Sequence, residues 1–144
     1  MTVNVQVTFD AADPRRLGAF WRDLLGYTDQ PPPAGYDSWS AWMDEHEMPP
    51  DMQDGWYSCV DPAGNGPRLY FQRVPEGKTA KNRVHLDVNV GQPRTDPSEL
   101  QRQRVDAAVE RAVGAGASVT RVLDDHGEYC VVMADPEANE FCLQ

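Results

Sequence analysis

The chain consists of two halves that repeat one order of elements, and this repeat restricts the folds open to it. Residues 3–9 and 83–90 both alternate apolar and polar side chains, which predicts two half-buried strands. Gln6 and His85 fall at the same point of this alternation. Since each strand is followed by a predicted helix and further strands, the two halves are expected to fold alike.

Both predicted helices begin at an Asp-Pro pair and end close to a glycine. Asp13 and Asp96 are expected to cap the first turn, because a carboxylate accepts hydrogen bonds from the free amides there. Gly26 and Gly114 suit a left-handed residue at the end of each helix. The apolar residues share one spacing: Leu17, Phe20, Trp21, Leu24 and Leu25 in the first half, and Val105, Ala108, Val109, Ala112 and Val113 in the second.

Each half closes with a strand, an Asp-Pro-x-x-Asn turn at 61–65 or 135–139, and a last strand. Alignment of the last strands puts Leu69 and Phe71 on the core face with Phe141 and Leu143. It puts Tyr70 and Cys142 on the opposite face. The order strand, helix, strands in both halves predicts an α+β fold of two βαβββ-type modules, the first of them altered by an insertion.

These 144 residues, 40% of them hydrophobic, are enough for one domain with a core that needs no disulfide or metal. We expect a single domain over 1–144. Its first module covers about 1–74 with a helical insertion at 36–50, its linker covers 75–82, and its second module covers about 83–144.

The insertion is aromatic and, over 36–54, acidic, with six Asp or Glu residues and no Lys or Arg from Asp37 to Asp54. Its pattern predicts a short helix that is capped by Asp37 and ended by Pro49-Pro50. Trp39 and Trp42 would either cover one edge of the sheet or form a lid over a ligand. The sequence leaves the role of the insertion open.

The charge argues against some partners. The chain has 13 basic and 23 acidic residues, a net charge of −10, which disfavours nucleic acid and anionic membranes. The segment from Arg68 to Arg83, however, contains five basic residues and one acidic residue. Its positive local charge favours an anionic ligand. With no long apolar run, no signal-peptide features and three scattered cysteines, the chain is expected to be cytoplasmic with free thiols.

Three motifs resemble the vicinal oxygen chelate superfamily, which includes glyoxalases, bleomycin-resistance proteins and extradiol dioxygenases. The segments 70–76, 81–87 and 135–142 look most like its bacterial glyoxalase-like domain branch. The resemblance covers nearly the whole chain and implies a curved mixed sheet that forms a cup, with helices outside. It also implies a small-molecule ligand and allows a homodimer, whereas its motifs are poorly specific for a reaction.

Superfamily members with a metal hold it by one residue from each first and each last strand. On this chain the resemblance carries those positions to Gln6, Tyr70, His85 and Cys142. The usual pattern is two histidines, or glutamine, and two glutamates, and both glutamates are missing here. Because hard divalent ions prefer anionic oxygen ligands, no metal is expected. If a divalent ion is bound, its ligands would be Gln6, His85 and Cys142.

Two functional hypotheses follow. The first is a small-molecule-binding protein with a degenerate pocket for an anionic or aromatic ligand; the second is a lyase or isomerase of the glyoxalase type, with a metal or with His85 as the catalytic acid-base. His85 could equally be a hydrogen-bonded imidazole and Cys142 a buried filler. The candidate ligand-binding residues are Asn4, Gln6, Thr8, Trp39, Trp42, Tyr70, Gln72, His85, Asp87 and Cys142.

Overall fold

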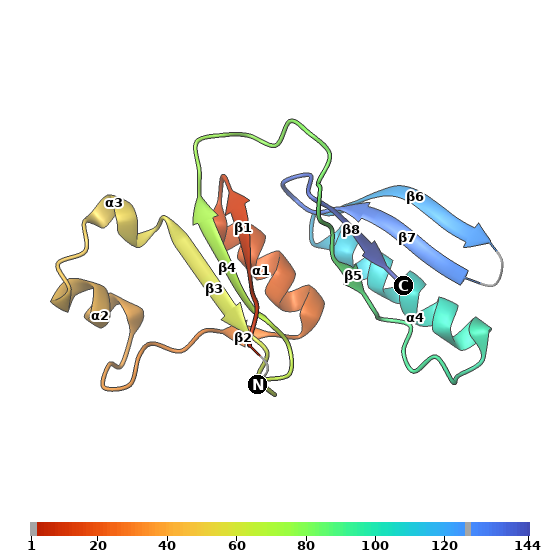
Figure 1. The fold of residues 1–144 in the computed structure, drawn as a ribbon, viewed down its shortest axis with the longest axis horizontal. Helices are drawn as coiled ribbons and strands as arrows, with labels where there is room; N and C mark the ends of the chain where they lie inside the picture. Colours follow the sequence, from red (N-terminus) through yellow and green to blue (C-terminus); the bar gives the residue numbers. More distant parts are fainter. Residues whose placement is uncertain (1–2, 126–127) are drawn as a thin grey trace. The chain divides into compact units, whose positions relative to one another are not determined.

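The computed structural model describes residues 3–125 and 128–144 and divides the chain into two compact units, residues 1–77 and 78–144. Each unit has one strand, a helix and three further strands in that order, as Figure 1 shows. The predicted α+β class and the tandem βαβββ order are therefore confirmed. Among the described residues, no helix is both long and apolar enough to cross a membrane.

Unit 1 is a four-stranded mixed sheet in the order β1-β4-β3-β2. Strand β1 runs parallel to β4, whereas β2, β3 and β4 are antiparallel neighbours. Helix α1 packs on one face of the sheet, and α2 and α3 lie beyond β3 (Figure 1). The elements are β1 (Gln6–Ala11), α1 (Pro14–Leu25), β2 (Thr28–Asp29), α2 (Trp39–Glu45), α3 (Pro50–Gln53), β3 (Trp56–Val60) and β4 (Arg68–Arg73).

Unit 2 repeats this topology with the strand order β5-β8-β7-β6. Strand β5 runs parallel to β8, and the other neighbours are antiparallel. Helix α4 packs against β6, β7 and β8. The elements are β5 (Asp87–Val88), α4 (Ser98–Gly114), β6 (Ser118–Asp125), β7 (Glu128–Ala134) and β8 (Glu140–Leu143).

The cores of the two units match in register. Leu69 and Phe71 of β4 are buried, as are Phe141 and Leu143 of β8, which confirms the predicted core face. On the neighbouring positions, Thr8 pairs with Tyr70 in unit 1 as Asp87 pairs with Cys142 in unit 2. The repeat therefore extends to the residues that face one another across the parallel strand pairs.

Helix α1 begins and ends as predicted, whereas α4 does not. Asp13 accepts a hydrogen bond from the Arg16 amide at 3.1 Å, and Gly26 is left-handed with φ 67°. The prediction that Asp96 caps the second helix is wrong, because Pro97 is the cap residue and the Asp96 carboxylate binds Arg104. Gly114 is still helical, and the glycine with positive φ is Gly116.

The insertion also differs in detail from its prediction. Helix α2 is capped by Ser38, whose hydroxyl accepts from the Ala41 amide at 3.1 Å, and not by Asp37. It ends at Glu45, before the proline pair. Pro50 instead begins the short helix α3, since proline is well suited to a first helical turn, which needs no amide donor.

The two first strands are shorter than their alternating patterns. Val3, Val5 and Val84 were expected on the core face, but they are 79%, 68% and 78% exposed. Strand β1 begins only at Gln6, which pairs with Arg68 at the start of β4, and β5 contains only Asp87 and Val88. Alternation alone does not place a residue in a core where no neighbouring strand extends far enough.

Glu140, at the start of β8, should make the stability of unit 2 sensitive to acid. Its carboxylate accepts from the Asn82 amide at 2.9 Å and pairs with Lys78 at 3.0 Å, and these contacts lower its pKa to about 2. A lowered folded-state pKa stabilises the fold above the unfolded value of 4.5, and this stability is lost as the pH falls toward 2. We expect the melting temperature of Glu140→Gln to depend less on pH between these two values than that of the parent chain. Equal acid sensitivity in Glu140→Gln, Glu110→Gln and the parent chain would contradict this.

Candidate functional site

The sheet face of unit 1 that is turned away from α1 carries four of the predicted ligand-binding residues. Gln6, Thr8 and Asp10 alternate along β1, and they pair in register with Arg68, Tyr70 and Gln72 of β4. The side chains are linked by hydrogen bonds, from the Gln6 amide to the Thr8 hydroxyl at 3.2 Å and from the Gln72 amide to Asp10 at 2.8 Å. The structure thus brings together Gln6, Thr8, Tyr70 and Gln72 as one polar row.

Arg68 lies at one end of this row, where β4 begins. Its Nη1 donates to Gln6 Oε1 and its Nε donates to Gln30 Oε1, both at 2.5 Å, and its guanidinium carbon lies 5.0 Å from the centre of the Tyr70 ring. Burial lowers the pKa of Arg68. None of the ion pairs among residues 3–125 and 128–144 includes it. A half-buried cation is therefore held by neutral acceptors and an aromatic ring.

An aromatic surface continues from Tyr70 to the edge of unit 1. Trp56 of β3 stacks on Tyr70, with ring centres 6.1 Å apart and planes at 20°. Both side chains line an open groove of about 560 Å³. The rest of its wall comes from Ala12, Asp51, Met52, Gly55, Arg73, Val74 and Pro75. Flat apolar walls with a few polar groups at the margin are typical of small-molecule sites.

Trp39 and Trp42 of the insertion have different surroundings. The Trp39 indole donates to the Gln30 carbonyl at 2.8 Å and contacts the Trp56 ring edge-on at 4.8 Å. Trp42 instead stacks on His46, with ring centres 4.2 Å apart. Trp39 thereby covers the edge of the sheet and lines a pocket of about 110 Å³ beside Trp56. A role of these indoles as a lid stays a prediction.

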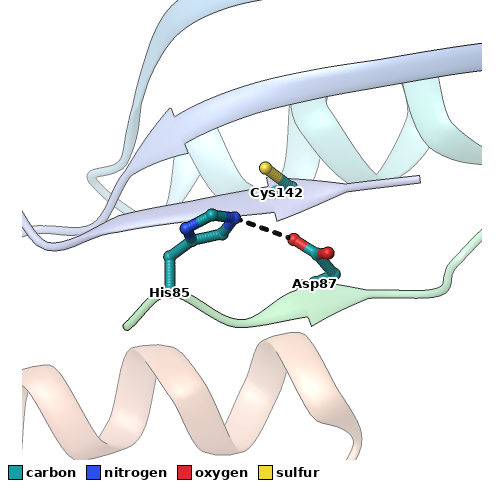
Figure 2. A group of neighbouring side chains, drawn as sticks. All are labelled: His85, Asp87 and Cys142. Atoms are coloured by element: carbon teal, nitrogen blue, oxygen red, sulfur yellow. Dashed lines mark ion pairs between the residues drawn. The ribbon is translucent and has the colours of Figure 1, made fainter. Parts of the chain in front are cut away.

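In unit 2 the structure gathers His85, Asp87 and Cys142, as Figure 2 shows. His85 and Asp87 lie on the same face two residues apart, and His85 Nε2 is 3.3 Å from Asp87 Oδ1. Cys142 on β8 pairs with Asp87, and the candidate ligand atoms of all three side chains lie within 4.8 Å of one another. His85 and Asp87 are about half exposed, at 46% and 48% of their side chains, so small molecules can reach them.

The Cys142 thiol is in a poor state for nucleophilic chemistry. Its residue is only 8% exposed. Burial, the neighbouring Cys130 thiol and the Asp87 carboxylate raise its pKa to about 12. Since the thiolate is the reactive form, this favours its interpretation as a buried filler beside the exposed imidazole.

The residue types of the two units differ in their fit to a divalent ion. In unit 1 the Gln6 oxygen already accepts from Arg68, whose positive charge also lies over Tyr70, so these two positions do not fit a cation. In unit 2 an imidazole, a carboxylate and a thiol are the donors of a zinc-type ion rather than of magnesium. Asp87 is thus a better third donor than Gln6 for the predicted set Gln6, His85 and Cys142. That the residues of both units face one hollow stays a prediction.

Arg68 was missed as an individual site residue. The only signal in the sequence was the basic stretch that it begins, in which it could not be distinguished from the solvent-exposed Lys81 or Arg83. Its importance depends on a tertiary contact, since Gln6 lies 62 positions away in the chain.

Several comparisons with known proteins bear on this arrangement. Three solved structures match nearly the whole chain, at identities that establish the fold alone. The first is a glyoxalase/bleomycin resistance protein/dioxygenase family enzyme from Burkholderia phytofirmans, with 18% identity, a TM-score of 0.59 and coverage of 96% of this chain and 94% of that one. The second is the fosfomycin resistance protein FosX from Mesorhizobium loti, with 11% identity, a TM-score of 0.64 and coverage of 100% and 91%.

The third is a bleomycin-binding protein from Streptomyces verticillus, solved with copper(II)-bleomycin, with 17% identity, a TM-score of 0.52 and coverage of 100% and 96%. The search of curated proteins finds no match. A family model described as a glyoxalase-like domain matches residues 6–144, from the first strand of unit 1 to the end of the chain. On this match, the chain belongs to the glyoxalase-like domain family.

Proposed function

We propose that this chain is a small-molecule-binding protein that holds its ligand on the polar and aromatic sheet face of unit 1 without a metal. The observation that carries the proposal is the position of Arg68, whose guanidinium hydrogen-bonds Gln6 and lies over Tyr70. Both of those positions would face a metal in the superfamily. With a fixed cation between them, a second positive charge would be repelled, whereas an organic ligand can use the remaining donors.

The surroundings of Arg68 support this proposal. The Thr8 hydroxyl, which accepts from Gln6, keeps its own proton to donate, and the Tyr70–Trp56 pair offers a flat apolar surface. Burial of a ring on such a surface, with a few hydrogen bonds at its margin, is the usual basis of small-molecule recognition. The Streptomyces verticillus relative with this fold is named a bleomycin-binding protein, a name that states binding and no reaction.

A ligand screen by thermal shift tests the proposal. A panel of neutral, anionic and aromatic compounds should include some that raise the melting temperature in the presence of a chelator, because a ligand that binds only the folded state stabilises it. Tyr70→Ala should reduce that shift, whereas Tyr129→Ala, which removes a tyrosine of unit 2, should leave it unchanged. A panel without any stabilising compound would overturn the proposal in favour of a structural or partner-binding module.

An enzyme of the lyase or isomerase type is the second candidate, and the group of His85, Asp87 and Cys142 favours it. An imidazole 3.3 Å from a carboxylate can be held in one tautomer and can accept or donate a proton at a substrate oxygen. A zinc-type ion held by the three side chains would polarise that oxygen as a Lewis acid.

The two candidates predict different effects of one substitution. If His85 is the catalytic acid-base, His85→Ala abolishes turnover of a stabilising compound while its binding persists. If the chain only binds, mass spectrometry finds the compound unaltered after prolonged incubation with the parent chain. Asp87→Asn separates the roles further, because it keeps the size of the side chain but removes the charge that orients the imidazole.

A further inference from the structure

Arg68 is unusual among the partly buried arginines of the described residues because no carboxylate neutralises it. The others, Arg22, Arg102 and Arg104, each form an ion pair with an Asp side chain, whereas the arginines outside this group are exposed. Arg68 is bound to two glutamine oxygens and a ring instead. Its charge is therefore held in place without being compensated.

The equivalent register position in unit 2 also carries a charged residue, but that charge is compensated. There Glu140 begins β8 as Arg68 begins β4, and its carboxylate is bound by Lys78 and the Asn82 amide. A charge that is partly removed from water without an opposite charge is unfavourable, and perturbed charged groups gather at ligand-binding sites. The difference between these two positions points to an external anion at Arg68.

The geometry leaves donors for that anion. Of its five N–H donors, Arg68 uses Nε–H for Gln30 and one Nη1 hydrogen for Gln6, so both Nη2 hydrogens and the second Nη1 hydrogen remain. Charged N–H groups of this kind make strong hydrogen bonds to carboxylate oxygens. The Thr8 hydroxyl, linked to Arg68 through Gln6, is a further donor on the same face.

The groove beside Tyr70 determines what the anion is attached to. Arg68 lies over the Tyr70 ring, and Tyr70 stacks on Trp56 along a groove of about 560 Å³. An oxyanion at Arg68 therefore has a flat apolar surface next to it. Building on the proposed function, we propose that the ligand is an aromatic or otherwise planar carboxylate, with its carboxylate on Arg68 and its ring beside Tyr70 and Trp56.

Isothermal titration with 2-naphthoate and 2-naphthamide tests this proposal, because the two probes share a ring system and differ in charge. The parent chain should bind naphthoate more tightly than naphthamide. Arg68→Gln should weaken naphthoate binding about 10- to 100-fold, the value of one charge-assisted pair, and should leave naphthamide binding unchanged. Arg68→Lys keeps a point charge but not the fork of donors. Its affinity for naphthoate should therefore lie between those of the parent chain and Arg68→Gln.

The control is Arg121→Gln, which removes an exposed arginine of β6 in unit 2 and with it the same net charge. Naphthoate affinity should not change in this variant. Equal binding of naphthoate by the parent chain and Arg68→Gln, with both melting normally, would overturn the proposal. Equal affinity of the parent chain for both probes would also overturn it, while leaving a metal-free binding site as proposed above. Failure of both probes and of the whole thermal-shift panel would remove the proposed function itself.

Discussion

Phe71→Ala should lower the free energy of unfolding by about 3–5 kcal/mol, as expected for removal of a fully buried phenylalanine ring. Phe71 is inaccessible in the centre of β4, where its ring stacks on Phe9 at 4.9 Å and contacts Tyr57 at 6.0 Å. Helix α1 covers this face of the sheet, so a cavity there would not be filled by water. Chemical denaturation followed by circular dichroism would measure the loss.

Phe141→Ala should have an effect of the same size, because Phe141 of β8 is a fully buried phenylalanine of unit 2, at the register position of Leu69. Val5→Ala provides the control. Its side chain continues the alternating pattern that predicts a core position, yet it is 68% exposed, so the substitution should change stability by less than about 0.5 kcal/mol. A large loss at Val5 together with a small loss at Phe71 would contradict the described core.

Gly18→Ala should destabilise unit 1 by about 1–3 kcal/mol, the usual cost of overpacking a core. A β-carbon at Gly18 would lie 1.9 Å from Tyr57 Cδ1 and 2.9 Å from Tyr57 Cγ, so the ring as a whole would have to move. The ring is tethered by the hydrogen bond from its hydroxyl to Asp29. Thermal melts of the variant would show the effect, and Tyr57→Leu in the same chain should restore part of the loss.

The same substitution in the other helix should have the opposite sign. Gly114 ends α4, and a β-carbon there would meet nothing within 4 Å. Gly114→Ala should therefore stabilise unit 2 by up to about 1 kcal/mol, because alanine loses less backbone entropy than glycine. Destabilisation by both substitutions to the same extent would indicate that Tyr57 is not the cause of the effect at Gly18.

The order of elements and the core could be predicted because the sequence contains them twice. Alternation, helical spacing and the Asp-Pro-x-x-Asn turns depend on local interactions that are present in each half, and they agree with one another. Phe71 and Phe141 were found on the core face for this reason. Leu69 and Leu143 follow from the same argument.

Helix ends and strand ends were less predictable, because they depend on what each residue meets in the folded chain. Asp96 has the sequence context of a cap, but its carboxylate binds the side chain of Arg104, which lies farther along α4. The cap residue of α2 is Ser38, one residue after the predicted Asp37. Val84 alternates correctly but lies before β5 begins, so no neighbouring strand covers it.

Half of the candidate site could be predicted from the repeat, and the other half could not. The pairs Thr8–Tyr70 and Asp87–Cys142 follow from equivalent register in the two units. The contact between Arg68 and Gln6 could not be predicted in this way. It depends on which parallel strand lies next to β1, and the residue of unit 2 that is equivalent to Arg68 is an acid. Whether a charged side chain has an opposite charge beside it can be decided only from the folded structure, where all of its neighbours are known.

The most direct test of metal-free binding compares ligand affinity before and after removal of metal. The compound that gives the largest thermal shift is titrated into the protein as purified and into protein stripped with a chelator. If Arg68 takes the place of an ion, as proposed, the two dissociation constants should agree within about twofold, well below the tenfold change that corresponds to 1.4 kcal/mol. A loss of tenfold or more on stripping, reversed by stoichiometric zinc or manganese, would contradict the account.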